Sequence, residues 1–260
     1  MTLRYWSRGR CPALTLGVLT IAIVLLYFWL HVPFTGPWAP VNDPRTVQMY
    51  ELIPMAAGAI ALYGIQPRLA WIDVQSPRPL RSANTLAAGC IAAVAAASAP
   101  AVRILWEYIP LYKVALPEES VLREATDLND FFPTLHILAF SVNTIFILGL
   151  TLVSIALLGL RWGPMSWIFW FVLLLTLQGY GHVDFMASVH DYSEPQAPSL
   201  LNCSAAVLSL SLGLLAYHCS LGGAQPLRPT ASRSARGTRR ETRETGPAAS
   251  QDEYRPRDVR

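Results

Sequence analysis

Two histidines and two aspartates that lie close together in the chain have the clearest potential for chemistry. They form the pattern His182-x-Asp184, followed by His190-Asp191. Imidazole and carboxylate groups suit zinc, and the same groups can relay protons. Histidines beside acids are also common in loops that have no such role, and this spacing matches no metal-binding motif. We therefore predict no metal site and no cofactor.

Other polar residues lie at the ends or inside long apolar stretches, where ionisable groups are costly and usually face a partner or a cavity. Arg103 and Glu107 are four residues apart and share one helix face. A contact between Glu51 and Arg103 would neutralise both charges. Asn143 and Gln178 lie deeper, and we expect them to line the same interior. The candidate site is a polar cluster at the ends of the apolar stretches that we place on the outer face of the membrane. Its residues are Glu51, Arg103, Glu107, His136, His182 and Asp184.

Three interpretations of this cluster remain open. It clamps the outer ends of the helices by ion pairs and hydrogen bonds, or it lines an exit for a substrate or an ion. In the third interpretation, His182, Asp184, His190 and Asp191 bind a metal ion or relay protons.

Six apolar runs position these residues. A hydrophobic fraction of 53% with only 14% charged residues is too apolar for an ordinary soluble domain. A helix needs about 20 mostly apolar residues to cross a bilayer. We expect an all-α fold, a polytopic membrane helix bundle within residues 1–220. The expected transmembrane helices are roughly 13–31, 47–65, 83–105, 133–160, 165–183 and 199–219.

Arginine marks one side of this bundle. Cytoplasmic loops retain Lys and Arg, which predicts a multi-pass protein of the cell (plasma) membrane with both termini in the cytoplasm. The segments on the opposite side hold only Arg45, Lys113 and Arg123. The short segments assigned to the cytoplasm hold Arg4, Arg8, Arg10, Arg68, Arg78, Arg81 and Arg161. The first run is expected to be an uncleaved signal anchor, because Trp38-Ala39-Pro40 is not a small-x-small cleavage site.

Two further segments have distinct compositions. In 83–105, Gly89, Ala93 and Ala97 recur every four residues, with Ala92, Ala96 and Pro100 beside them. Such faces of small residues suit close helix contacts. We place this helix in the middle of the bundle, with Gly89 and Ala93 at a close contact. Residues 117–132 predict a short amphipathic helix on the outer membrane surface; the alternative is an irregular acidic loop.

The tail, 221–260, holds nine arginines and almost no large apolar residues. We expect it to be disordered and to bind anionic lipid weakly. Nucleic-acid binding would rest on this tail alone, and membrane-surface attraction is the simpler use of its charge, so we expect no nucleic-acid partner.

Several enzyme motifs are missing from the sequence. The only lysine, Lys113, has no glycine-rich turn before it, so ATP is not bound through a P-loop. No two histidines are four residues apart, and there is no Gly-x-Ser-x-Gly elbow. We expect that the chain is not an enzyme.

Three segments carry a resemblance: Ser76-Pro-Arg-Pro-Leu-Arg81, Asn143-Thr-Ile-Phe-Ile-Leu-Gly149 and Gly159-Leu-Arg-Trp162. With them the chain resembles a loose group of small actinobacterial six-span proteins that accompany ABC-type exporters. The resemblance implies a permease-like subunit driven by a separate ATPase, which would dock on loop 66–82. The docking residues would be Arg68, Trp71, Asp73, Arg78 and Arg81. In such permeases the outer helical insertion precedes the last span, whereas here it follows the third.

Two other function classes remain. One is a non-transporting assembly or immunity factor whose helices bind a partner, and the other is an intramembrane metal-dependent enzyme. The sequence specifies neither a substrate nor an oligomeric state.

Overall fold

The computed structural model of the chain describes residues 10–30, 32–35, 46–67, 80–110, 133–181, 198–220 and Gly223. All of them belong to one compact unit, Met1–Leu227; the second unit is Arg228–Arg260. The predicted surface helix at 117–132, loop residues 68–79 and the tail after Gly223 lie outside the described residues.

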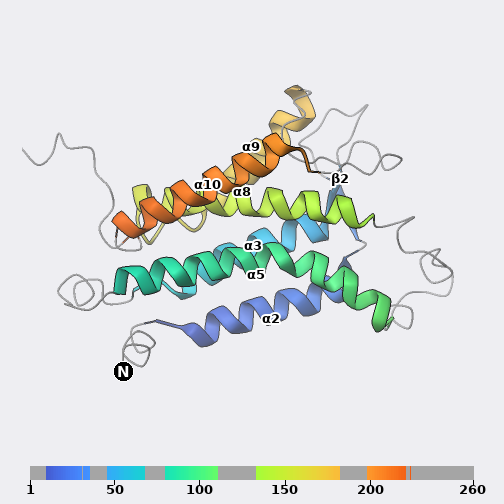
Figure 1. The fold of residues 1–260 in the computed structure, drawn as a ribbon, viewed down its shortest axis with the longest axis horizontal. Coiled ribbons are helices and arrows are strands. Elements are labelled where there is room, and N and C mark those ends of the chain that lie inside the picture. Colours follow the sequence, from blue (N-terminus) through green and yellow to red (C-terminus); the bar gives the residue numbers. More distant parts are fainter. Residues whose placement is uncertain are drawn as a thin grey trace, which may run out of the picture. The chain divides into compact units, whose positions relative to one another are not determined.

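Six helices make up most of the described chain (Figure 1). Each overlaps one of the six predicted stretches, so the all-helical fold class is confirmed. The helices are α2 (Pro12–Trp29), α3 (Met49–Gly64), α5 (Leu80–Tyr108), α8 (Thr134–Leu158), α9 (Ser166–Gly181) and α10 (Leu200–Cys219).

Four of these helices, α2, α5, α8 and α10, are long and apolar enough to cross a membrane. The other two, α3 and α9, have 16 residues each. At 1.5 Å per residue this corresponds to about 24 Å, which is shorter than a hydrocarbon core of about 30 Å.

A small hairpin that the sequence analysis did not predict lies between α2 and α3. Strand β1 (Pro33–Thr35) pairs antiparallel with β2 (Thr46–Gln48), and Phe34 lies opposite Val47. Val47 is buried against Met55 and Phe171. Because this packing holds Thr46–Gln48 in an extended conformation, α3 begins at Met49 instead of the predicted residue 47. The three extended residues lengthen the α3 segment by about 10 Å.

Successive helices run in opposite directions, so the bundle has two ends (Figure 1). At the hairpin end, on the right in Figure 1, Leu30, Tyr50, Trp106 and Ile137 pack together. The turn end, on the left, contains the α8–α9 turn (159–165), where Ile65, Ile155 and Tyr217 share one cluster.

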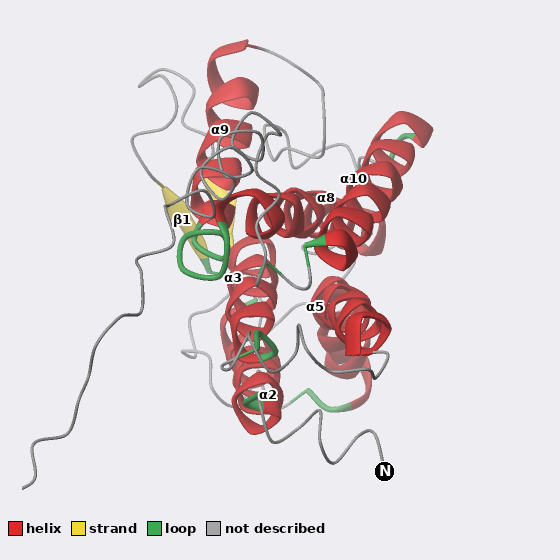
Figure 2. Cartoon of the chain, turned by 90° about the vertical axis from the view of Figure 1, so that its left-hand side faces the viewer, coloured by secondary structure: helices red, strands yellow, loops and turns green. Residues whose placement is uncertain are grey.

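Helix α5 packs against α2, α3, α8 and α10, as expected of a central helix (Figure 2). However, the prediction of its close-contact face was wrong for the three residues at its centre, while the adjacent Ala92 and Ala96 are buried. Ala93 and Ala97 are exposed and Gly89 is half-buried, whereas the buried face holds Ala88, Ala92, Ala95 and Ala99. Small residues occur on both faces of this alanine-rich helix, so their spacing alone does not identify the packed one.

The closest helix contact joins α8 and α10. A side chain at Gly149 would meet the Ser209 hydroxyl and would lie 2.6 Å from the Leu210 backbone nitrogen. A side chain at Gly213 would meet the Gly149 carbonyl oxygen. The Ser209 hydroxyl also donates to the Phe146 carbonyl at 2.9 Å. Glycine and serine permit this approach, as is typical of helices packed within membranes.

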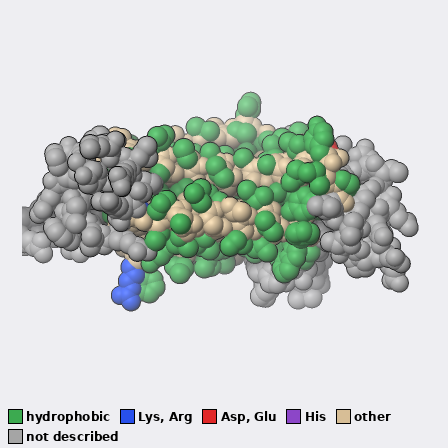
Figure 3. Space-filling view, turned by 90° about the horizontal axis from the view of Figure 1, so that it is seen from below, with side chains coloured by type: hydrophobic (Ala, Val, Ile, Leu, Met, Phe, Trp, Pro, Cys, Tyr) green, Lys and Arg blue, Asp and Glu red, His purple; other side chains and the backbone are tan. Residues whose placement is uncertain are grey.

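The outer faces of the helices are apolar. Figure 3 shows hydrophobic side chains over much of the described face that it presents. Exposed examples are Leu16 on α2, Leu86 on α5 and Leu208 on α10. A large exposed apolar surface marks contact with lipid or another protein. Together with the four membrane-capable helices, this surface indicates a membrane protein.

Candidate functional site

The polar residues predicted to face the interior are buried. The exposed fractions are 0% for Glu51, 1% for Arg103, 3% for His136, 0% for Asn143 and 2% for Gln178. These side chains come from α3, α5, α8 and α9. We call these five residues and Glu107 the interior polar cluster. Protein atoms therefore shield the buried polar groups from lipid, which is the arrangement expected of polar groups inside spans.

Arg103 and Glu107 form a salt bridge along α5. The Arg103 Nη1 donates to Glu107 Oε1 at 2.8 Å. The Arg103 side chain is 1% exposed, whereas that of Glu107 is 50% exposed. A buried cation is therefore connected to the surface of the hairpin end through its carboxylate partner. Their shared helix face is confirmed.

The contact between Glu51 and Arg103 stays a prediction. Both side chains are buried, and their chain neighbours Tyr50 and Val102 belong to the same cluster at the hairpin end. The two charged residues thus belong to packed helices at the same end of the bundle.

Hydrogen bonds between α2 and α5 hold the end of α5 that carries Arg103 and Glu107. The Trp106 indole donates to the Tyr27 carbonyl at 2.9 Å. The Tyr27 hydroxyl donates in return to the Ile109 carbonyl. Trp106 is 1% exposed, so its hydrogen bond is shielded from competing solvent. The two hydrogen bonds together fix the end of α5 against α2.

His136 lies in the first turn of α8, as predicted, and faces inward. Its ring stacks on Phe140 with centroids 5.9 Å apart, and Phe140 contacts the Tyr50 ring edgewise at 5.3 Å. The His136 Nε2 is buried without a hydrogen-bond partner among the residues that the structure describes. This nitrogen is available to a proton or a polar ligand.

Asn143 continues the same face of α8 two turns further on. The hydroxyls of the neighbouring polar residues are used within the helix, since Thr144 donates to Phe140 and Thr151 to Ile147. His136 and Asn143 therefore supply the ring and amide groups on the buried face of α8.

The remaining predicted residues fall largely outside the described part. This holds for His182 and Asp184 with their neighbours His190 and Asp191, so the interpretation as a metal site or proton relay stays untested. It also holds for the proposed docking residues Arg68, Trp71, Asp73 and Arg78. Arg81 is described and lies exposed in the first turn of α5.

The sequence analysis missed a second set of buried polar side chains, at the turn end. Gln66 is 6% exposed, Tyr217 0% and Arg10 5%. The Arg10 Nε donates to the Ile65 carbonyl at 3.1 Å, which joins the start of α2 to the end of α3. This set was hard to predict, because polar residues where an apolar run ends are usually interfacial.

Comparison of the chain with known protein families, curated proteins and solved structures gives no match. The features that bear on its function are the helices, the two buried polar sets and the distribution of charge.

Proposed function

We propose that the chain is a six-span cell-membrane protein that acts as a non-enzymatic, permease-like subunit of a transport system powered by a separate ATPase. The burial of the interior polar cluster carries this proposal. Five polar side chains from four helices are 0–3% exposed inside an apolar bundle. Ionisable groups in such a place mark substrate and ion pathways.

The distribution of charge supports the proposed orientation. Of the four arginines in the described ranges, Arg10, Arg81 and Arg161 belong to the turn end. Arg103 and both described glutamates, Glu51 and Glu107, belong to the hairpin end. Since cytoplasmic segments retain arginine, the turn end is assigned to the cytoplasm.

The ends of the helical region support an even number of crossings. Arg10, before α2, donates a hydrogen bond to the Ile65 carbonyl. Ser220, after α10, donates to the carbonyl of Tyr217, which belongs to the same cluster as Ile65. Both segments therefore lie at the turn end. The helices α3 and α9 are shorter than the hydrocarbon core, so six crossings require residues beside each helix to complete its passage through the membrane. Strand β2 supplies such an extension for α3.

In this proposal the interior polar cluster forms the outer part of a substrate path. The half-exposed Glu107 receives a polar substrate group at the outer surface. The buried Arg103 stabilises the negative charge of Glu107 from the interior side. His136 and Asn143 continue the path along α8. The ATPase binds at the cytoplasmic end through loop 66–82 and the start of α5, where Arg81 is exposed.

Reconstitution with an ATPase tests this function. The chain is placed in proteoliposomes with a candidate ABC-type ATPase from the same cells, and ATP hydrolysis is measured. We expect the chain to stimulate hydrolysis several-fold and Arg81→Ala to remove most of the stimulation. Arg233→Ala, which removes the same charge from the tail, is the matched control. Unchanged hydrolysis on adding the chain would contradict the proposal.

One observation favours partner binding without transport as a second candidate. A hollow of about 660 Å³ between α5 and α10 is lined by Gly89, Cys90, Ala93 and Leu214, among others. Small residues on an outer face allow another membrane helix to approach closely. In this alternative, a partner helix can be crosslinked to the parent chain through Cys90. Ala93→Leu should abolish this crosslink and leave the melting temperature of the isolated chain unchanged. No crosslinked partner in native membranes would count against it.

A further inference from the structure

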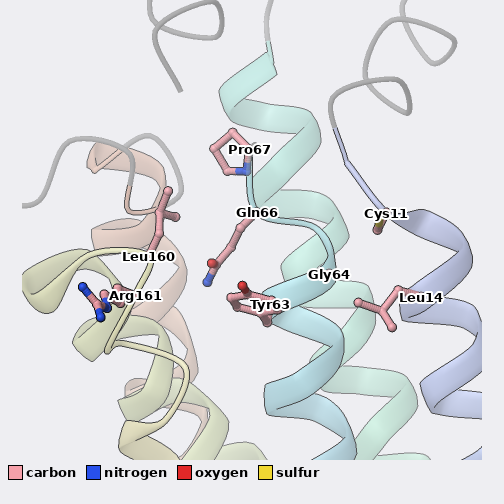
Figure 4. A pocket seen from close by; sticks show the side chains of 8 residues that line it. All are labelled: Cys11, Leu14, Tyr63, Gly64, Gln66, Pro67, Leu160 and Arg161. Carbon is pink, nitrogen blue, oxygen red and sulfur yellow. The ribbon is translucent and has the colours of Figure 1, made fainter. Parts of the chain in front are cut away.

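A pocket of about 360 Å³ lies at the turn end, between the start of α2, the end of α3 and the α8–α9 turn (Figure 4). It is separate from the interior polar cluster, which supplies none of its lining. The lining includes Cys11, Tyr63, Gly64, Gln66, Leu160 and Arg161.

Gln66 places a hydrogen-bond donor inside this pocket. Its side chain is 6% exposed, and its Nε2 is buried without a hydrogen-bond partner among the described residues. Figure 4 shows the amide extending from the end of α3 into the space between Tyr63 and Arg161. Buried donors are nearly always bonded in folded proteins, so an acceptor on a ligand would complete the hydrogen bonding here.

The charge around the pocket is positive. Arg161 lines it and is exposed, and its guanidinium carbon lies 5.4 Å from the centre of the Trp162 ring. Arg10 is buried beside the pocket, next to Cys11 in the chain and bonded to the Ile65 carbonyl. None of the lining residues that the structure describes carries a carboxylate. The guanidinium group of Arg161 and the amide donor of Gln66 both line the pocket. Such a pair of donors suits a ligand group with several anionic oxygens.

We propose that this pocket binds the phosphate group of an anionic ligand, with Arg161 and the Gln66 Nε2 as donors. Two sources share this chemistry: a phospholipid headgroup and a soluble phosphate ester. The pocket borders the lipid-facing surface, since Leu14 also lines it and is 43% exposed. An acyl chain could thus lie along α2 while its phosphate occupies the pocket. The inference is independent of transport.

Binding to the purified full-length chain in detergent tests the proposal with three probes. Phosphatidylglycerol carries both phosphate and acyl chains, diacylglycerol lacks the phosphate, and glycerol 3-phosphate lacks the chains. We expect a 1:1 complex with a phosphate probe, detected by native mass spectrometry, and at least tenfold weaker binding in Arg161→Gln and Gln66→Met. Arg161 is exposed, so its variant should fold even if the Gln66 variant does not. Arg81→Gln, with the same charge change at the same end, should bind within twofold of the parent.

Thiol reactivity provides a second readout and separates the two sources. Cys11 lines the pocket, whereas Cys219 is exposed at the turn end and is not among the lining residues. Protection of Cys11 from maleimide by phosphatidylglycerol alone identifies a lipid headgroup site. Protection by glycerol 3-phosphate as well identifies a site for soluble phosphate esters. Equal binding of diacylglycerol and phosphatidylglycerol, or unchanged binding in both pocket variants, would overturn the proposal.

Discussion

The guanidinium of Arg103 donates to the carboxylate of Glu107, 2.8 Å away and one turn further along α5. The arginine side chain is almost fully buried, whereas half of the glutamate side chain is exposed. The pair is therefore asymmetric: loss of the glutamate leaves a buried cation, but loss of the arginine leaves a carboxylate that water can reach.

Glu107→Gln should lower the free energy of unfolding by about 1 kcal/mol, because water screens the half-exposed carboxylate and the glutamine oxygen can still accept a hydrogen bond from Arg103. The measurement is thermal unfolding of the purified chain in detergent. Glu118→Gln, which removes the same charge from a residue outside the site, serves as the control. A Glu107 variant as stable as this control would show that the salt bridge contributes nothing.

The predicted pairing of Glu51 with Arg103 is tested by a double-mutant cycle with Glu51→Gln and Arg103→Gln. Either single change should destabilise the chain more than the double change, because each single change removes one charge of the predicted pair and leaves the other, whereas the double change removes both. Strictly additive effects on stability would mean that the two side chains do not interact. Glu107 would then be the residue that stabilises the charge of Arg103.

Gly149→Ala should destabilise the bundle by about 1–3 kcal/mol. The added methyl group would lie 2.6 Å from the backbone nitrogen of Leu210, so α8 and α10 must move apart. Gly17→Ala on α2 is the matched control, because a side chain there meets nothing within 4 Å. Equal melting temperatures of the two variants would rule out the close α8–α10 contact.

The orientation of α5 is tested by two neighbouring alanines. Ala92 is fully buried and Ala93 is exposed. Ala92→Leu should therefore cost about 1–3 kcal/mol through overpacking, whereas Ala93→Leu should leave the melting temperature of the isolated chain nearly unchanged. The reverse order would restore the face that the sequence pattern suggested.

The part of the tail after Leu227 should be dispensable for folding. Gly223 is buried with φ +81° and donates from its backbone nitrogen to the Ser220 hydroxyl at 3.0 Å. A truncation after Leu227 keeps this capping contact and should accumulate in membranes at the parental level, as judged by immunoblotting of the membrane fraction. A severe loss of this truncated chain would show that the tail supports folding.

The helices could be predicted because apolar length and helix-ending residues decide them locally. Predicted stretch 133–160 became Thr134–Leu158, between Pro133 and Gly159, whose φ of 81° suits the helix end. Helix α5 instead extends beyond its predicted bounds, to Leu80–Tyr108, because its polar ends remain helical. The hairpin could not be predicted, since the extended conformation of β2 depends on Val47 packing against Met55 on α3 and Phe171 on α9, and Phe171 is distant in the chain.

The inward orientation of Asn143 and Gln178 was predictable because polar groups in spans avoid lipid. The pocket beside Gln66 was not, because three separate segments form it. The packed face of α5 could not be predicted from the sequence pattern either. Large side chains on α8, such as Leu148 and Leu152, determine which of the alanines on α5 are buried.

Cysteine labelling in intact cells tests the central claim, a six-span bundle with its turn end in the cytoplasm. The four native cysteines are replaced by serine, and single cysteines are introduced at Pro40, Glu119, Glu194, Pro77 and Arg233. A membrane-impermeant maleimide should label the first three positions in intact cells and the last two only after the membrane is opened. Labelling of Pro77→Cys or Arg233→Cys in intact cells, or failure to label any of the first three, would contradict the proposed topology.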